Sequence, residues 1–274
     1  MSGEELKGPP LRVPTIGNNP LYYNQERDGT LDDHAPKSVS VLFIGAHPDD
    51  FELGCGGTIA SHVDRGDSVH LLIFTDGGTG VRGIEKKRVP RYPAGIAVQA
   101  ESGFSSPGWQ NAHKAAEMLG VQSIQILDWP DSKFDTVTEL DSAHAIEAAL
   151  EAHKPSIVYT HHPGDLSVDH RRVAEATNAA CRPKTGVKEI YYYHVPSSTD
   201  WAPAHSGLPF IPALYVDISD YYVLKQKVLS EVYGCEMREC HPRSIDAVID
   251  RDRLNGSRIC VDVAEAFMVG RILR

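Results

Sequence analysis

Short apolar segments rich in β-branched residues alternate with helix-like segments along most of this chain. The strand candidates are residues 38–45, 68–75, 123–127, 156–160, 189–195 and 213–218. The helix candidates are residues 58–66, 111–119, 141–153, 170–181, 221–233 and 244–254. Strands that alternate with helices form a mostly parallel sheet with helices on both faces, so the pattern predicts an α/β fold.

The chain divides into an arm and one large domain. Residues 1–37 are rich in Pro, Gly, Asn and charged residues, which predicts an N-terminal arm on the surface that can pack on a neighbouring subunit of a homo-oligomer. Residues 38–274 are expected to form a single domain, a size that allows a substantial core. Within it, residues 80–108 look irregular, and a loop of that length is usually functional or mobile.

Composition excludes several classes of protein. The formal net charge of −10 argues against sequence-independent nucleic-acid binding, which needs clustered Lys and Arg. No apolar run is long enough to cross a membrane, and the first residues do not resemble a secretory signal. The five cysteines include no Cys-x-x-Cys pair, which favours a reducing compartment. We therefore expect a cytoplasmic protein without a membrane span.

A first cluster of polar residues, Ala46-His47-Pro48-Asp49-Asp50, directly follows the first strand candidate. Ligands of open α/β sheets bind at the carboxyl ends of the strands, so a site is expected here. Ordinary structural explanations also exist, because an Asp before a helix can be its N-cap and His-Pro can form a turn. Two adjacent acids can also point in different directions, one binding a metal while the other accepts a proton from water.

A second cluster spans residues 160–170, THHPGDLSVDH, and also follows a strand candidate. Its simplest explanation is a surface turn with a helix cap at Asp169, but three histidines and two aspartates exceed what a turn needs. A catalytic zinc takes three protein ligands and keeps one open position for water. His47 and Asp50 can supply two ligands and His170 the third, if the two loops meet at one sheet edge.

These clusters resemble the LmbE-like, or PIG-L, family of zinc-dependent N-deacetylases. VLFIGAHPDDFELGCGGTIA is similar to the family's opening strand, metal loop and helix, and HHPGDLSVDHRRV to a branch whose later loop ends in Asp-His. Residues 197–201, 236–244 and 264–267 are also similar to that branch, so the likeness runs from about Ser38 to the C-terminus. The resemblance implies a Rossmann-like fold and a small-molecule partner, an N-acetylated amino sugar or its conjugate.

The resemblance also implies residue roles. His47, Asp50 and His170 would be the ligands of Zn²⁺, or of another divalent metal, and Asp49 the general base. Asp169 would orient a histidine from behind the site.

Three positions depart from the family pattern. Where many relatives carry a histidine assigned to the oxyanion or to acid catalysis, this chain has Ser167. His161 or His162 is the candidate replacement, and we prefer His161. Phe51 stands where relatives carry an acid, and Trp109-Gln110-Asn111 where they carry an Arg and a Glu. Substrate contacts must therefore differ, with Arg82, Arg88 or Arg91 as candidates, and Arg243 and His241 as further ones.

Three functions remain open. The first is hydrolysis of the N-acetyl group of an N-acetylglucosamine-type sugar that is free, nucleotide-linked or part of a glycoconjugate or secondary metabolite. The second is a metal-dependent amidase that cleaves a thiol-sugar conjugate. The third is a sugar-nucleotide-binding protein without turnover, for which Gly54-Cys55-Gly56-Gly57 could cradle a phosphate, although close helix packing explains these glycines better.

Overall fold

The computed structural model describes residues 38–77, 106–203, 208–234 and 239–274. These residues belong to one compact unit, Ser38–Arg274. The arm predicted at residues 1–37 lies outside the described residues, and the division into arm and domain stays a prediction.

The described residues contain one seven-stranded sheet with the order β3-β2-β1-β4-β5-β7-β6. Its strands are β1 (Ser40–Gly45), β2 (Ser68–Ile73), β3 (Ser123–Ile126), β4 (Ile157–His161), β5 (Glu189–Tyr193), β6 (Leu214–Asp217) and β7 (Ala264–Ile272). Strands β1 to β5 are parallel, and β7 runs antiparallel to β5 and β6. The predicted mostly parallel sheet is confirmed.

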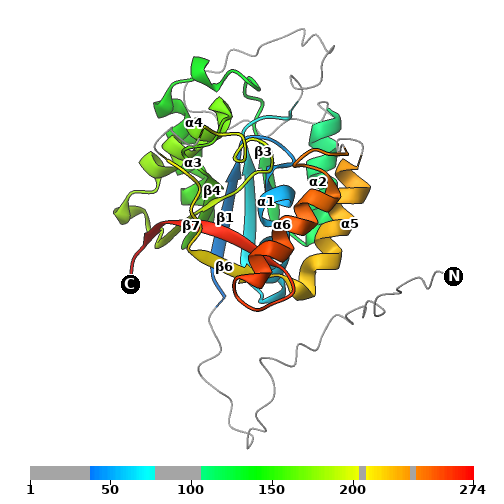
Figure 1. Cartoon of the computed structure of the whole chain (residues 1–274). Helices are drawn as coiled ribbons and strands as arrows, with labels where there is room; N and C mark the ends of the chain where they lie inside the picture. Colours follow the sequence, from blue (N-terminus) through cyan, green and yellow to red (C-terminus); the bar gives the residue numbers. More distant parts are fainter. Residues whose placement is uncertain (1–37, 78–105, 204–207, 235–238) are drawn as a thin grey trace, which may run out of the picture. The chain divides into compact units, whose positions relative to one another are not determined.

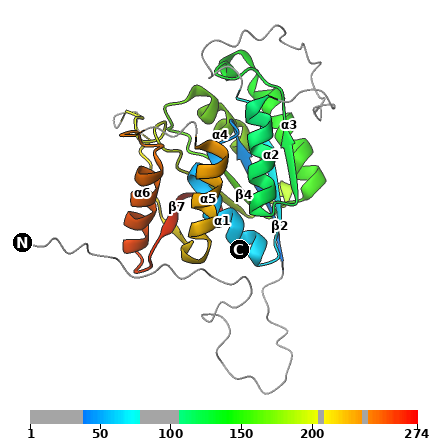
Figure 2. The ribbon, with the colours of Figure 1, turned by 90° about the vertical axis from the view of Figure 1, so that its right-hand side faces the viewer.

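Helices cover both faces of this sheet (Figures 1 and 2). They are α1 (Asp50–Asp64), α2 (Pro107–Leu119), α3 (Glu139–His153), α4 (Val168–Ala180), α5 (Tyr222–Tyr233) and α6 (Ile245–Ser257). Side chains of a strand alternate between faces. Val41 and Phe43 of β1 therefore pack toward α1, α2 and α5, whereas Leu42 and Ile44 pack toward α3 and α4. The resulting two-sided core is the one expected of an α/β fold.

The glycine segment 54–57 lies inside α1, not before a helix as the sequence suggested. The helix kinks at Cys55 (φ −151°, ψ 21°), which frees backbone N–H groups after the kink. Those of Gly57 and Thr58 donate to the Glu265 carboxylate at 2.9 and 2.7 Å. A Cβ on Gly57 would lie 2.7 Å from Ile218. The glycines therefore allow close packing. The backbone N–H groups that could bind a phosphate already donate to the Glu265 carboxylate.

Strand β7 is the element that the pattern did not predict. It carries Glu265 in its buried half and Gly270-Arg271 in its outer half, which interrupt an apolar run. Glu265 is 1% exposed because it caps the kink of α1 and pairs with Lys225 at 2.8 Å. Because Glu265 is charged and bonds to a helix distant in sequence, the pattern of residues 264–272 does not look like that of a buried strand.

None of the helices in the described residues has both the length and the apolar character needed to cross a membrane.

Candidate metal centre

The two polar clusters meet where the sheet order reverses. From β1 the chain continues to β2 and β3 on one side, whereas β4 and β5 lie on the other. Residues 46–49 follow β1 and residues 162–167 follow β4, and these two strands are direct neighbours. In open α/β sheets, ligands bind at such a switch point, at the carboxyl ends of the strands.

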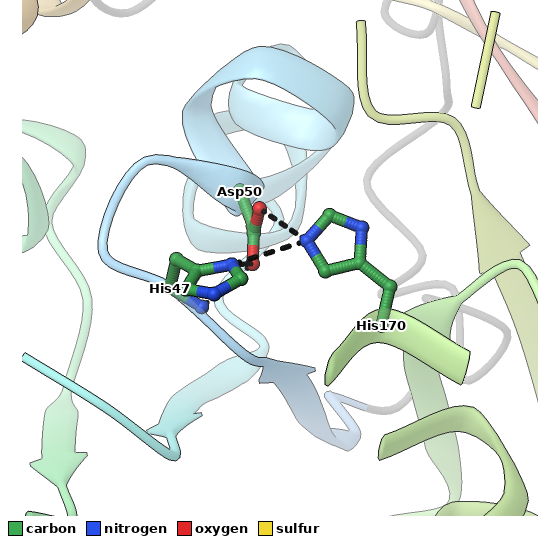
Figure 3. A group of neighbouring side chains, drawn as sticks. All are labelled: His47, Asp50 and His170. Atoms are coloured by element: carbon green, nitrogen blue, oxygen red, sulfur yellow. Dashed lines mark hydrogen bonds and ion pairs between the residues drawn. The ribbon is translucent and has the colours of Figure 1, made fainter. Parts of the chain in front are cut away.

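His47, Asp50 and His170 point toward one another at this place (Figure 3). His47 comes from the loop after β1, Asp50 opens α1, and His170 lies in the first turn of α4. His47 Nδ1 is 3.1 Å from His170 Nε2, which is 3.3 Å from Asp50 Oδ1. His47 Nδ1 is 3.5 Å from Asp50 Oδ2. The structure therefore brings together the three residues named as metal ligands.

The geometry of these donors fits a zinc ion. Zinc bonds of about 2.0–2.1 Å in tetrahedral geometry place neighbouring ligand atoms roughly 3.3 Å apart, close to the three separations above. Asp50 Oδ1 is buried and accepts no hydrogen bond from the described residues, although His170 Nε2 lies 3.3 Å away. Burying this carboxylate is costly, and a cation bound beside it would offset that cost. Imidazole and carboxylate also suit other divalent metals.

The charges of the cluster favour a cation as well. Burial lowers the pKa of His170, but the carboxylates of Asp50 and Asp165 outweigh it and raise this pKa to about 9. Burial lowers the pKa of His47 too, yet Asp50 and further carboxylates hold it well above its usual value. A divalent cation bound among these carboxylates would compete with protons for the imidazole nitrogens, so its binding would release protons.

Asp165 orients His170. Its Oδ1 lies 3.2 Å from His170 Nδ1, which leaves Nε2 facing Asp50. Thr199 Oγ1 donates to Asp165 Oδ2 at 2.6 Å, and the Ser167 N–H donates to Oδ1 at 2.8 Å. Burial raises the pKa of Asp165, but its bonds to His170, Thr199 and Ser167 lower it to about 2. The sequence reasoning gave Asp165 no role, although it stands in the same loop as His170.

Asp169 and Asp131 face the other ring nitrogen of His47. Its Nε2 lies 3.2 Å from Asp169 Oδ2 and 3.3 Å from Asp131 Oδ1. Asp169 is held by the backbone N–H groups of Ser132 and Phe134 at 2.6 and 3.2 Å. Carboxylates in this position fix the ring so that Nδ1 points toward the metal. Asp169 thus lies where a histidine-orienting residue should, and Asp131 was missed because no motif surrounds it.

Asp49 has a different partner from its neighbour Asp50. Its Oδ2 accepts a hydrogen bond from Arg243 Nη1 at 2.5 Å. Arg243 Nε in turn donates to the Pro196 carbonyl and to Ser197 Oγ, each at 3.2 Å. Arg243, expected to contact substrate, is therefore placed against the candidate base.

His161 is entirely buried behind Asp50. Its Nε2 accepts from the Ala46 N–H at 2.9 Å and lies 3.2 Å from both Asp50 Oδ2 and the Tyr193 hydroxyl. Its ring stacks on His170 with centroids 3.9 Å apart. Burial and the neighbouring His170 lower its pKa to about 4. A neutral buried ring against Asp50 suits positioning better than contact with a substrate oxygen.

The other residues named from the sequence have ordinary contacts or lie outside the described residues. His241 packs edge-on against Trp201 with ring centroids 5.2 Å apart and accepts the Arg243 N–H at Nδ1. Ser167, not Asp169, is the N-cap of α4, accepting the His170 N–H at 3.4 Å. Arg82 lies outside the described residues.

Comparison with known proteins identifies the family. The model of the PIG-L family, described as GlcNAc-PI de-N-acetylase, matches residues 42–181, which include every residue of the metal cluster. The chain belongs to the PIG-L family. This confirms the resemblance seen in the two clusters.

Several relatives of the chain are named as deacetylases. The chain is 28% identical to the uncharacterized deacetylase YaiS of Escherichia coli, over 74% of this chain and 96% of that protein. It is 28% identical to the diacetylchitobiose deacetylase of Thermococcus kodakarensis, over 69% of this chain and 67% of that protein. The N,N'-diacetylchitobiose deacetylase structure from Pyrococcus horikoshii has the same fold, with a TM-score of 0.62, 20% identity and coverage of 89% and 88%.

Proposed function

We propose that this PIG-L family member is a zinc-dependent hydrolase that removes the acetyl group from an N-acetylglucosamine-type sugar. The observation that carries the proposal is the convergence of His47, Asp50 and His170 next to a second acid, Asp49. Family membership and the relatives named as deacetylases support the reaction, and the names of the family model and of the chitobiose enzyme support the amino-sugar class.

The reaction is hydrolysis of an amide, in which water adds to the acetyl carbonyl, the C–N bond breaks, and acetate and a free amine form. His47, Asp50 and His170 would hold a zinc ion, which would act as a Lewis acid and lower the pKa of a nearby water. Asp49 then takes the proton of the attacking water and returns it to the leaving nitrogen. Arg243 holds Asp49 Oδ2, so the direction in which the carboxylate faces is fixed before substrate binds.

The residues around the ligands keep this arrangement rigid. Asp165 and Asp169 each fix one imidazole, and the buried ring of His161 packs against Asp50 and stacks on His170. Asp49 is 8% exposed, which keeps most of the carboxylate away from bulk water while leaving an edge accessible. Such preorganised groups need no rearrangement during the reaction.

Replacement of Asp49 tests the proposal. Asp49→Asn should keep bound zinc, measured by atomic absorption, but lower acetate release by about 100-fold or more, because the amide cannot accept the proton. Asp64→Asn is the control, since Asp64 is exposed at the last residue of α1, the far end of the helix that Asp50 opens. A wild-type rate for Asp49→Asn would remove Asp49 as the base.

Screening acetate release from free, nucleotide-linked and lipid-linked N-acetylglucosamine identifies the substrate. Cleavage of only a thiol-sugar conjugate would support the amidase alternative. Tight binding of a sugar nucleotide without acetate release, in a protein inert to added zinc, would support the non-catalytic one.

A further inference from the structure

The segment that follows β5 lies against the candidate metal centre. Successive turns run through residues 196–201. Ser197 Oγ accepts a hydrogen bond from Arg243 Nε at 3.2 Å, and Ser198 Oγ lies 3.3 Å from Nδ1 of His170. Two consecutive side chains of this segment therefore contact the arginine that holds the candidate base and one residue of the metal cluster.

The end of this segment is held in place by its own hydrogen bonds. The backbone N–H of Ser197 donates to Asp200 Oδ2 at 2.8 Å, and Asp200 also pairs with Arg251 at 2.8 Å. The backbone N–H of Trp201 donates to the Ser197 carbonyl at 2.9 Å. Trp201 is therefore fixed one turn away from the residue that contacts Arg243.

The indole of Trp201 is exposed although its backbone is held. Trp201 is 54% exposed, and its ring meets that of His241 edge-on, with centroids 5.2 Å apart. His241 Nδ1 accepts the backbone N–H of Arg243 at 3.1 Å. The indole thus lies against the chain segment that carries Arg243, and much of its surface stays open to solvent.

Two further apolar side chains are exposed on adjoining segments. Leu166 is 46% exposed, and its backbone N–H donates to the Ser198 carbonyl at 3.0 Å. Leu208 is 52% exposed, and its Cβ would lie 2.8 Å from a Cβ on Gly164. Single exposed apolar residues are ordinary, but several on adjoining segments beside a polar site are typical of a ligand-binding surface.

The burial of the reacting groups indicates which part of a substrate can reach Trp201. His170 is 1% exposed and Asp49 is 8% exposed, so the acetamide that reacts beside them must enter deepest. The group that the sugar carries away from the acetamide then lies nearer to solvent, where the indole is exposed. Arg243 contacts both Asp49 and Ser197, and Ser197 bonds to Trp201, so the indole adjoins the place of reaction.

We propose that Trp201 is a specificity-determining residue whose indole stacks on an aromatic aglycone of the N-acetylated amino sugar. Aromatic rings gain both apolar contact and favourable stacking from an indole. Sites for small molecules typically combine a few polar groups with an apolar lining. The metal centre would hold the acetamide, and the indole would select the group attached to the sugar. This inference rests on the proposed function, because it needs the sugar at the metal centre.

Comparison of two substrates is the first test. Phenyl and methyl N-acetyl-β-D-glucosaminide differ only in the aglycone, and acetate release gives kcat/KM for each. We expect wild type to prefer the phenyl glycoside about tenfold. The preference should appear mainly in KM, because the aglycone contact is the same before and during the reaction.

Three variants locate this preference in the structure. Trp201→Ser should remove most of it, whereas Trp201→Phe, which keeps an aromatic ring, should retain most of it. Val223→Ser is the control and should keep the preference of wild type. Val223 is 48% exposed and lies two residues after Tyr221, which donates to Asp64 at the far end of α1. The inference is overturned if wild type does not prefer the phenyl glycoside, or if Trp201→Ser keeps the preference.

Binding measurements separate this inference from the proposed function. Failure of wild type to release acetate from either glycoside would refute the proposed function. Calorimetry with zinc-loaded wild type then decides the inference by itself. Binding of the phenyl glycoside about tenfold more tightly than the methyl glycoside, with the difference lost in Trp201→Ser, supports the stacking role. Equal affinities, or no binding of either glycoside, overturn it.

Discussion

Replacing Asp165 by Asn separates the role of this carboxylate in the metal centre from its role in stability. Asn keeps the size of the side chain but has one acceptor oxygen where the carboxylate has two. It cannot accept from Thr199 and from His170 Nδ1, now 3.2 Å from Asp165 Oδ1, at the same time. The imidazole also loses its charged partner, so the ring is held less firmly. We expect zinc affinity to fall about 10- to 100-fold, as for other partners of ligating histidines.

The stability change follows from the pKa of Asp165, which falls from 3.8 to about 2 on folding. Because the folded pKa is depressed, the carboxylate stabilises the native state above about pH 4, and this contribution is lost as the pH falls through 2. At about 1.36 kcal/mol for each pKa unit, the contribution at pH 7 is about 2 kcal/mol. Asp165→Asn should lose roughly that amount from the free energy of unfolding of the metal-free protein.

Two assays and one control variant test this reasoning. Urea unfolding in excess EDTA gives the stability, and competition with a chromophoric chelator gives the zinc affinity. Asp200→Asn is the control, because Asp200 lies outside the metal cluster. Burial raises its pKa, but the His194 imidazole 2.9 Å away, Arg251 and the Ser197 N–H lower it to about 2. Asp200→Asn should lose stability but not zinc affinity. Equal zinc affinity in wild type and Asp165→Asn would refute the orienting role.

Three further substitutions have definite expected outcomes. Arg243→Met should lower kcat about tenfold or more with unchanged zinc content, because Asp49 loses its fixed orientation; a lowered zinc content instead would contradict this. Lys225→Met leaves two buried carboxylates without their cation and should cost about 3–5 kcal/mol in urea unfolding. Gly57→Ala should cost about 1–3 kcal/mol by overpacking, whereas Gly56→Ala, whose Cβ would meet its nearest neighbour at 3.4 Å, should not.

The architecture was predictable because each strand carries its own signal. The runs of β1, β2, β4 and β5 are mostly apolar or aromatic and largely buried, as parallel strands covered on both faces must be. Strand β7 lacked that signal, because its buried Glu265 accepts from α1 and pairs with Lys225. The sequence around Glu265 cannot show that its partner Gly57 lies 208 positions earlier.

The three residues of the candidate metal cluster could be named from sequence because His47, Asp50 and His170 each stand in a dense polar cluster directly after a strand. Their supporting residues could not. Asp131 lies in a turn without a motif and reaches His47 only through the tertiary fold. Arg243 looked like a substrate contact because nothing in its neighbourhood shows that it reaches Asp49, 194 residues earlier.

The strand geometry that builds the candidate metal centre also turns the next residues away from it. His161 of β4 and its register partner Tyr193 of β5 lie on the side of the centre, whereas His162 and His194, which follow these strands, line a cavity beside it. Thr199 lines this cavity too, but it also donates to Asp165, the partner of His170. Because His162 has no such bond to Asp165, substitutions of His162 should leave zinc affinity, measured by chelator competition, unchanged, and a loss as large as that of Asp165→Asn would contradict this reasoning.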